Sequence, residues 1–190
     1  MYFGSKPTDG GYFFLTPEEK QVIVRKEPQS EKYIRKVLGA QEYINNVERY
    51  CLWLVGITPS ELKSSPMIYE RVKKVREFRL ASKAESTRKF ADRPTEFKQN
   101  AQPNKPYLIV PRVSSENRRY VPIGYIDPEV IATDATQIIP NATLYEFGVI
   151  TSNVHMAWMR TVAGRLKSDY RYSSTIVYNT FPWPKITEEQ

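Results

Sequence analysis

The feature that most constrains the fold of this chain is a change of periodicity at Gly164. Before this glycine, apolar residues recur at three- and four-residue steps, as on one buried helix face. Glycine adopts left-handed backbone angles without penalty, so Gly164 is a suitable helix end. After it, the period becomes two. The sequence therefore predicts a helix followed directly by an extended strand, with the helix face made by Val149, Ile150, Val154, Trp158, Thr161 and Val162.

The predicted strand carries a row of charges of mixed sign. Alternation places Arg165, Lys167, Asp169 and Arg171 on one face of an extended segment. Such a row is more often a solvated surface. Here both signs occur together and tyrosines lie on either side, which favours a recognition surface.

Lys167 and Asp169 have the hydrogen-bonding groups needed to read a G·C pair. In the major groove, guanine offers O6 and N7 as acceptors to a lysine, and cytosine offers its N4 amino group to a carboxylate. The alternative is a local ion pair worth at most about 1 kcal/mol. Hydrogen-bonding chemistry alone leaves both interpretations open.

Most of the chain resembles one family. It is similar to the target recognition domain of the MmeI-type (type IIL/IIG) restriction–modification enzymes, single chains that join an endonuclease, an adenine-N6 methyltransferase and a recognition module. The matching stretches follow the family's order: 4–19 (GSKPTDGGYFFLTPEE), 39–54 (GAQEYINNVERYCLWL), 88–97 (RKFADRPTEF), 108–127 (LIVPRVSSENRRYVPIGYID), 147–173 (FGVITSNVHMAWMRTVAGRLKSDYRYS) and 178–184 (YNTFPWP).

The resemblance assigns roles to individual residues. In the family, the positions matching Lys167 and Asp169 contact the last base pair of the site, and a Lys/Asp combination goes with G. The position matching Arg171 is also a recognition residue, with its partners somewhere in 131–138. The resemblance implies three partners: double-stranded DNA and the methyltransferase and endonuclease domains of the same chain. It places S-adenosylmethionine and Mg in the parent enzyme and no cofactor in this segment.

Composition agrees with a nucleic-acid partner. The 190 residues carry a net charge of +7, with a sequence pI near 9.4 and 41% hydrophobic residues. A folded basic chain favours a polyanion. The alternative is a basic module that docks on an acidic protein without reading DNA sequence. No apolar run approaches the length of a membrane span, and no signal peptide is apparent, so we expect a cytoplasmic protein without a membrane partner.

The motifs of catalysis are missing from the sequence. It contains no Asn/Asp-Pro-Pro-Tyr/Phe loop to hold a flipped adenine and no Pro-Asp…Glu-x-Lys nuclease arrangement. One cysteine and one histidine exclude a conventional zinc site, so no metal site is expected. Cys51 lies in an apolar run and is predicted to be buried. His155 is predicted to be a core or capping residue. We expect no catalytic residue and no catalysis by this chain alone.

The remaining pattern predicts an α+β fold: a small mixed or antiparallel sheet with several helices. Residues 1–184 are expected to form a single target recognition domain with an internal loop at 92–106. Residues 185–190 would begin a C-terminal extension, and the chain is expected to be a fragment of a longer one. Helices are predicted from Thr16, from Ser30 to Gly39, over 67–91 and from Leu144. Strands are predicted at 12–15, 49–55, 108–110, 120–125, 128–131 and 137–139.

Two further groups of basic residues are predicted to contact the DNA backbone or neighbouring bases. The helix predicted over 67–91 has eight basic and three acidic residues, which leaves it at +5. Its distal end is the first group, and the alternative is a charge-paired surface helix. The second is a cluster of Arg, Ser and Asn before the strand at 120–125, together with two arginines of the C-terminal segment. The candidates are Lys83, Arg88, Lys89, Arg112, Ser114, Arg118, Arg119, Arg160 and Arg165.

Overall fold

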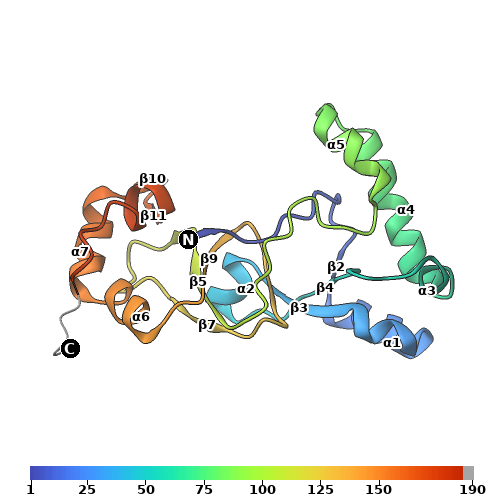
Figure 1. Ribbon diagram of the computed structural model, residues 1–190, viewed down its shortest axis with the longest axis horizontal. Helices are drawn as coiled ribbons and strands as arrows, with labels where there is room; N and C mark the ends of the chain where they lie inside the picture. The colour runs from blue at the N-terminus through green and yellow to red at the C-terminus, as the bar shows by residue number, and fades with distance from the viewer. Residues whose placement is uncertain (186–190) are drawn as a thin grey trace.

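A computed structural model describes residues 1–185 of the chain, and it confirms the α+β class (Figure 1). The helices are α1 (Pro17–Lys26), α2 (Ala40–Asn45), α3 (Pro59–Lys63), α4 (Pro66–Leu80), α5 (Glu85–Lys89), α6 (Leu144–Ile150) and α7 (Asn153–Val162), with short helical turns at Pro28–Tyr33, Phe90–Asp92 and Ser174–Tyr178. The strands are β1 (Tyr2–Phe3), β2 (Phe14–Leu15), β3 (Ile34–Leu38), β4 (Tyr50–Leu52), β5 (Tyr107–Pro111), β6 (Val113–Ser114), β7 (Gly124–Ile126), β8 (Ile131–Ala132), β9 (Thr136–Pro140), β10 (Gly164–Leu166) and β11 (Asp169–Arg171).

The described residues contain three small sheets where one was predicted. Their strand orders are β2-β4-β3-β8, β1-β9-β5-β7 and β10-β11-β6. All pairs are antiparallel except β3 with β8. The molecule is elongated: the first sheet and helices α1, α3 and α4 lie at one end of the long axis, and the β10–β11 hairpin lies at the other with α6 and α7 (Figure 1). The extent of the recognition domain, 1–184, stays a prediction.

The N-terminal end is built around one apolar core. Thr16 begins α1 with a capping box, in which its hydroxyl accepts from the Glu19 amide and the Glu19 carboxylate accepts from the Thr16 amide. The apolar sides of α1 and α4 then pack on the first sheet, and Cys51 is fully buried there, as predicted. Burial raises the pKa of the Cys51 thiol. The core contains Phe13, Leu15, Ile23, Leu52, Ile68, Val72 and Val75.

A second core supports the C-terminal end. It joins Leu108, Val110 and Ile139 of the central sheet to Ile150, Met156 and Met159 of α6 and α7. Tyr170, Tyr172 and Val177 from the C-terminal segment also belong to it. The segment 179–184 also packs onto this core, because Phe181 is buried and its ring meets those of His155 and Trp183.

Several predicted elements differ from those observed. The helix predicted over Ser30–Gly39 is a short 3-10 turn followed by β3, and Gly39 begins α2 instead of ending a helix. Of the strand predicted at 120–125 only residues 124–125 are extended, as part of β7, and of that at 128–131 only Ile131 is, as part of β8. In each case pairing with a neighbouring strand decides the conformation, which local periodicity does not encode.

Two long helices predicted from periodicity are broken. The helix over 67–91 ends at Leu80 and resumes as α5 at Glu85. The helix over 149–162 is divided at Thr151, and the Ser152 hydroxyl caps α7 by accepting from the His155 amide. This restart turns a different face inward: Met156 and Met159 are buried, whereas Val154 of the predicted face is 71% exposed. Within residues 1–185 no helix has the length and apolar character that crossing a bilayer requires.

The loop predicted at 92–106 begins one residue later, because Asp92 still belongs to the turn Phe90–Asp92, and it is not a free linker. Lys6 and Gln99 exchange two backbone hydrogen bonds, and the Lys98 amide donates to the Pro7 carbonyl. Phe97 packs into the N-terminal core. The loop and the N-terminal segment thus run side by side and connect the two ends of the molecule (Figure 1).

Candidate DNA-recognition surface

The charged row at 165–171 is a hairpin and not the single strand that alternation predicts. β10 and β11 pair antiparallel, with Gly164 opposite Arg171, Arg165 opposite Tyr170 and Leu166 opposite Asp169. Lys167 and Ser168 form the turn, and Lys167 has a φ of +56°. Lys167 therefore lies at the exposed tip of a projecting hairpin (Figure 1).

The hairpin register corrects the predicted face. Residues directly opposite one another in an antiparallel pair share a face, and neighbours along a strand alternate. Asp169 and Arg171 thus share one face with Leu166. Arg165 points to the other face, with Tyr170. The prediction that Arg165 shares a face with Asp169 and Arg171 is wrong.

Arg165 fastens the hairpin internally. Its guanidinium donates to a Glu116 carboxylate oxygen at 3.0 Å and to the Ser168 carbonyl at 2.5 Å, and it lies 4.0 Å from the centre of the Tyr170 ring. These contacts join the turn, both strands and the 112–119 segment. Arg165 thus has a structural function in this conformation, and its predicted DNA contact is untested.

Lys167, Asp169 and Arg171 have no such internal partners. Among the described residues, their side chains make no hydrogen bond and no ion pair, including with each other. The lysine and Arg171 are exposed, and Asp169 is partly exposed. The local ion pair offered as an alternative for Lys167 and Asp169 is therefore not formed in this structure.

β6 pairs with the hairpin, and this pairing buries Ser114, one of the candidate DNA contacts. Tyr170 and Arg171 pair with Ser114 and Val113 of β6. Ser114 is 3% exposed, and its hydroxyl has no partner among the described residues. A hydroxyl shielded from solvent in this way does not reach a phosphate, so the prediction of a Ser114 backbone contact is wrong for this conformation.

The other basic residues beside β6 are exposed. Arg118 and Arg119 lie in the loop that follows it, and the Arg119 guanidinium lies over the Tyr120 ring at 5.4 Å. Arg160 of α7, which is half-buried, donates to the Arg119 carbonyl and so ties this loop to the helix. The structure brings these three arginines to the same end of the molecule as the hairpin.

Arg112 lies between the hairpin and the central sheet. Its guanidinium donates to the Asp134 carbonyl at 3.0 Å and lies 4.6 Å from the centre of the Phe3 ring. A cavity of about 300 Å³ opens beside it, lined by Phe3, Arg112, Gln137, Gly164, Arg171, Tyr172, Ser173 and Ile176. This cavity connects the Arg171 face of the hairpin to the edge of the central sheet.

Most of the segment 131–138, in which residues that read DNA together with Arg171 were expected, is buried. Of residues 131–138, six are buried, and only Asp134 and Ala135 are accessible. Asp134 also faces Lys6, whose ammonium lies 3.8 Å from its carboxylate. Lys6 and Phe3 were not predicted as site residues, since a two-residue edge strand followed by an irregular segment gives no periodic signal.

The second predicted group lies at the opposite end of the molecule. Lys83, Arg88 and Lys89 are exposed on and around α5. In Figure 1, α5 and the hairpin lie at opposite ends of the long axis, both in the upper half of the view. Arg88 donates to the carbonyls of Ser82 and Lys83, and Lys89 pairs with Glu85 at 2.8 Å. Both contacts are exposed and weak, so the charges stay available to a polyanion.

The basicity of α4 is less available than its charge count suggests. Arg79 is fully buried and donates five hydrogen bonds, to the carbonyls of Pro7, Thr8, Phe90, Arg93 and Glu96, at 2.7–3.4 Å. Desolvation lowers the pKa of Arg79. This guanidinium fastens α4 to the N-terminal segment and to the 90–96 turn, and it is not a phosphate contact.

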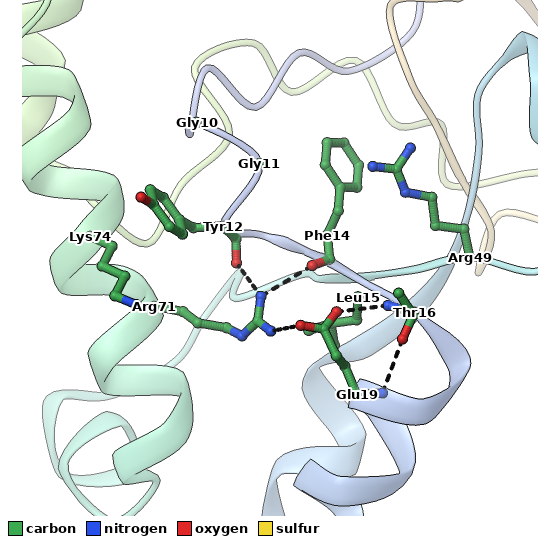
Figure 2. Close-up of a pocket in the computed structure, with 10 residues that line it drawn as sticks. All are labelled: Gly10, Gly11, Tyr12, Phe14, Leu15, Thr16, Glu19, Arg49, Arg71 and Lys74. Atoms are coloured by element: carbon green, nitrogen blue, oxygen red, sulfur yellow. Dashed lines mark hydrogen bonds and ion pairs between the residues drawn. The ribbon is translucent and has the colours of Figure 1, made fainter.

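A cavity of about 460 Å³ lies between β2, α1 and α4 (Figure 2). Gly10 and Gly11, both with positive φ, form part of its rim with Lys74. Three of the charged side chains around it, Glu19, Arg49 and Arg71, have partners within the protein. Arg71 donates to Glu19 at 2.5 Å and to the carbonyls of Tyr12 and Phe14, as Figure 2 shows. These contacts join α1, β2 and α4 around the cavity.

His155 is a core residue, as predicted. It is fully buried, its Nε2 lies 2.7 Å from the Tyr172 hydroxyl, and burial lowers its pKa from 6.5 to about 4. It is therefore neutral near pH 7 and has no exposed surface of its own.

Comparison with known proteins decides the family. A family model described as "MmeI, target recognition domain" matches residues 1–185. The chain belongs to this family. DNA methyltransferase A of Bacillus subtilis is 38% identical over 187 residues, which cover 98% of this chain and 21% of that protein. A solved structure of the Type IIL restriction-modification enzyme MmeI in complex with DNA matches with a TM-score of 0.95 and 49% identity.

The match to MmeI covers 99% of this chain and 25% of that chain. The chain therefore spans between a fifth and a quarter of the length of these two relatives. The resemblance recognised in the sequence is confirmed.

Proposed function

We propose that this chain reads a specific sequence of double-stranded DNA for a restriction–modification enzyme and positions a target adenine for N6 methylation by a domain outside the segment. The observation that carries the proposal is the hairpin tip, where Lys167, Asp169 and Arg171 are accessible and lack internal partners within residues 1–185. Membership of the target recognition domain family and the DNA-bound state of the MmeI relative support it.

Lys167 and Asp169 are proposed to read one G·C pair. The turn places the lysine at the tip, and the carboxylate follows two residues later at the start of β11. The lysine ammonium would donate to guanine O6 and N7, and the carboxylate would accept from cytosine N4. Because Arg165 fastens the turn to Glu116 and Tyr170, both readers start from a fixed backbone.

Arg171 is proposed to read another position together with the accessible part of 131–138. That part is Asp134 and Ala135. The cavity beside Arg112 joins Arg171 to this edge of the sheet. Arg118, Arg119 and Arg160 near the hairpin, and Lys83, Arg88 and Lys89 on α5, are proposed to neutralise phosphates.

The remaining activity is proposed for domains beyond this segment. A methyltransferase domain that binds S-adenosylmethionine and an Mg-dependent endonuclease domain would share its chain. The 190 residues alone are proposed to bind DNA without catalysing methyl transfer or cleavage. A role on DNA is consistent with a cytoplasmic protein.

The test uses the full-length protein that carries this segment. Its methylated motif is determined by methylation-sensitive sequencing, for the wild type and for the double variant Lys167→Glu with Asp169→Arg. We expect the motif to change from G to another base at one position only. A bidentate contact discriminates by about 1–3 kcal/mol, so the preference for the original motif should fall by about fivefold to 150-fold.

An unchanged motif in an active double variant would show that Lys167 and Asp169 do not read bases. A basic module that docks on an acidic protein is the remaining alternative. It would not discriminate between duplex sequences, whereas a DNA reader must. Binding to duplexes with and without the motif, measured at several salt concentrations, separates the two.

A further inference from the structure

Leu166 is a large apolar side chain exposed among the charged groups of the hairpin. It is 56% exposed, although it precedes Lys167 and lies directly opposite Asp169. A single exposed leucine is ordinary on a protein surface. Leu166 differs because the hairpin register places it on the face of Asp169 and Arg171, within the group of proposed readers.

The apolar character continues along this face. Gly164, opposite Arg171, lines the cavity beside Arg112, and no atom lies within 4 Å of the position that a Cβ on Gly164 would occupy. Phe3 and Ile176 line the same cavity and are 49% and 51% exposed. Exposed apolar groups gathered within a polar rim indicate a contact surface.

The basic and the apolar side chains of this face suit different parts of a nucleic acid. Lysine and arginine contact phosphates and base edges. A leucine gains little from either, except at a thymine methyl group. It packs well against the faces of bases, which a duplex exposes only where its stack is opened, and apolar wedges of this kind are a known means of holding DNA open.

Methylation of adenine N6 requires such an opening. Enzymes that modify a base extrude it from the duplex, at the cost of its stacking and pairing. We propose that Leu166 enters the stack at the position vacated by the target adenine and packs against the neighbouring bases. The inference rests on the proposed function above and adds a positioning residue to it: Leu166 acts on the extruded state of the DNA and takes no part in methyl transfer.

The hairpin is rigid enough for this role. β11 is paired on both sides, with β10 and with β6, and Arg165 ties the turn to Glu116 and to the Tyr170 ring. Tyr170 itself is packed into the C-terminal core. A side chain on this hairpin is therefore presented from a fixed backbone, as insertion into a stack requires.

The experiment measures base extrusion directly in the full-length protein. The target adenine identified by sequencing is replaced with 2-aminopurine, whose fluorescence rises when it leaves the stack. Wild type and Leu166→Ala are compared on this duplex. We expect the fluorescence rise on binding to fall to less than half in Leu166→Ala. The rate of methylation of ordinary duplex should fall about tenfold, and the methylated motif should stay the same.

Two controls separate insertion from damage to the fold. Leu144→Ala removes the same group from a leucine that is 79% exposed at the start of α6, outside the hairpin, and should leave both signals unchanged. Leu166→Met keeps an apolar side chain of similar length and should retain most of the activity. A mismatched target adenine is easier to extrude, so on that substrate Leu166→Ala should approach the wild-type rate.

An equal defect on matched and mismatched duplexes would overturn the inference, and so would an unchanged fluorescence rise. A motif relaxed at one thymine would instead identify Leu166 as a contact to a thymine methyl group, which also contradicts insertion. The swap at Lys167 and Asp169 tests the proposed function separately. If the double variant Lys167→Glu with Asp169→Arg changes the motif, while Leu166→Ala keeps the full fluorescence rise, the proposed function stands and only the role of Leu166 is wrong.

Discussion

Arg79 and Arg171 show two uses of the same side chain at opposite ends of the molecule. Arg79 is fully buried and spends all five of its donors on backbone carbonyls. Arg171 is exposed and donates to no atom among the described residues. The net charge of +7 does not distinguish them. The difference teaches that the availability of donors, and not the count of charges, marks a surface that binds DNA.

The largest effect is expected at Arg79. Arg79→Met would remove five hydrogen bonds and leave the buried carbonyls of Thr8 and Glu96 without any donor among the described residues. Removing one side of a buried charged network costs about 3–5 kcal/mol. Denaturant unfolding of the chain measures this loss. Arg76→Met, on the exposed side of the same helix, should change stability by less than about 0.5 kcal/mol. A similar loss of stability in Arg79→Met and Arg76→Met would contradict the distinction between buried and exposed arginines.

The second effect concerns the only histidine of the chain. Its pKa is lowered from 6.5 to about 4 in the folded protein. Between these values the unfolded chain takes up a proton that the folded protein does not, so stability falls as pH decreases from about 6.5 to about 4, by up to about 3 kcal/mol. Unfolding at pH 7, 5.5 and 4.5 measures this dependence.

His155→Gln is the control for this pH dependence. It removes the titrating group, so most of the dependence in this window should disappear, although the variant itself is less stable. If His155→Gln kept the full pH dependence, other titrating groups would be its cause, and burial of His155 would not be linked to the pH dependence of stability.

A third prediction contrasts two arginines of the hairpin itself. Arg171→Ala in the full-length protein should weaken binding to the cognate duplex by about 1–3 kcal/mol and relax the motif at one position. Arg165→Ala should leave the choice of base unchanged, because its guanidinium is engaged with Glu116, Ser168 and Tyr170. It should instead lower affinity by loosening the turn. Equal relaxation by both variants would contradict the assignment of faces.

The smallest effect is expected from the exposed charges of α5. Changing Lys83, Arg88 and Lys89 to Gln should weaken binding equally for all sequences and reduce the slope of log K against log salt by up to about 2.7. A matched triple variant, Lys20, Arg25 and Lys26 to Gln, removes the same charges from α1, on the other side of the molecule (Figure 1). Equal slopes in both variants would show that α5 contributes only general charge.

Local signals in the sequence were sufficient for several features. The Thr16-Pro17-Glu18-Glu19 pattern predicts a helix start from neighbouring residues alone, and α1 begins there, with a capping box between Thr16 and Glu19. His155 and Cys51 were expected in the core and lie there. The resemblance to the family was also recognisable from sequence, because its stretches extend along most of the chain.

The hairpin could not be predicted from its residues. An alternation of two describes a straight strand and a tight hairpin equally well, and the turn at Lys167 and Ser168 lacks the Asn-Gly or Asp-Gly pair that identifies such turns. Lys167 instead adopts a positive φ that lysine seldom takes. The same limit applies to α6 and α7, whose division at Thr151 reassigned the buried face to Met156 and Met159.

The sequence by itself determined the family, the α+β class and the residue types able to read a G·C pair, because these follow from local patterns and side-chain chemistry. The tertiary structure alone decided which basic residues are available. It buried Arg79 and Ser114, stacked the Arg165 guanidinium on the Tyr170 ring and left Leu166 exposed opposite Asp169. The physical reason is that burial and hydrogen-bond satisfaction depend on segments distant in sequence, such as Pro7 and Arg93 around Arg79.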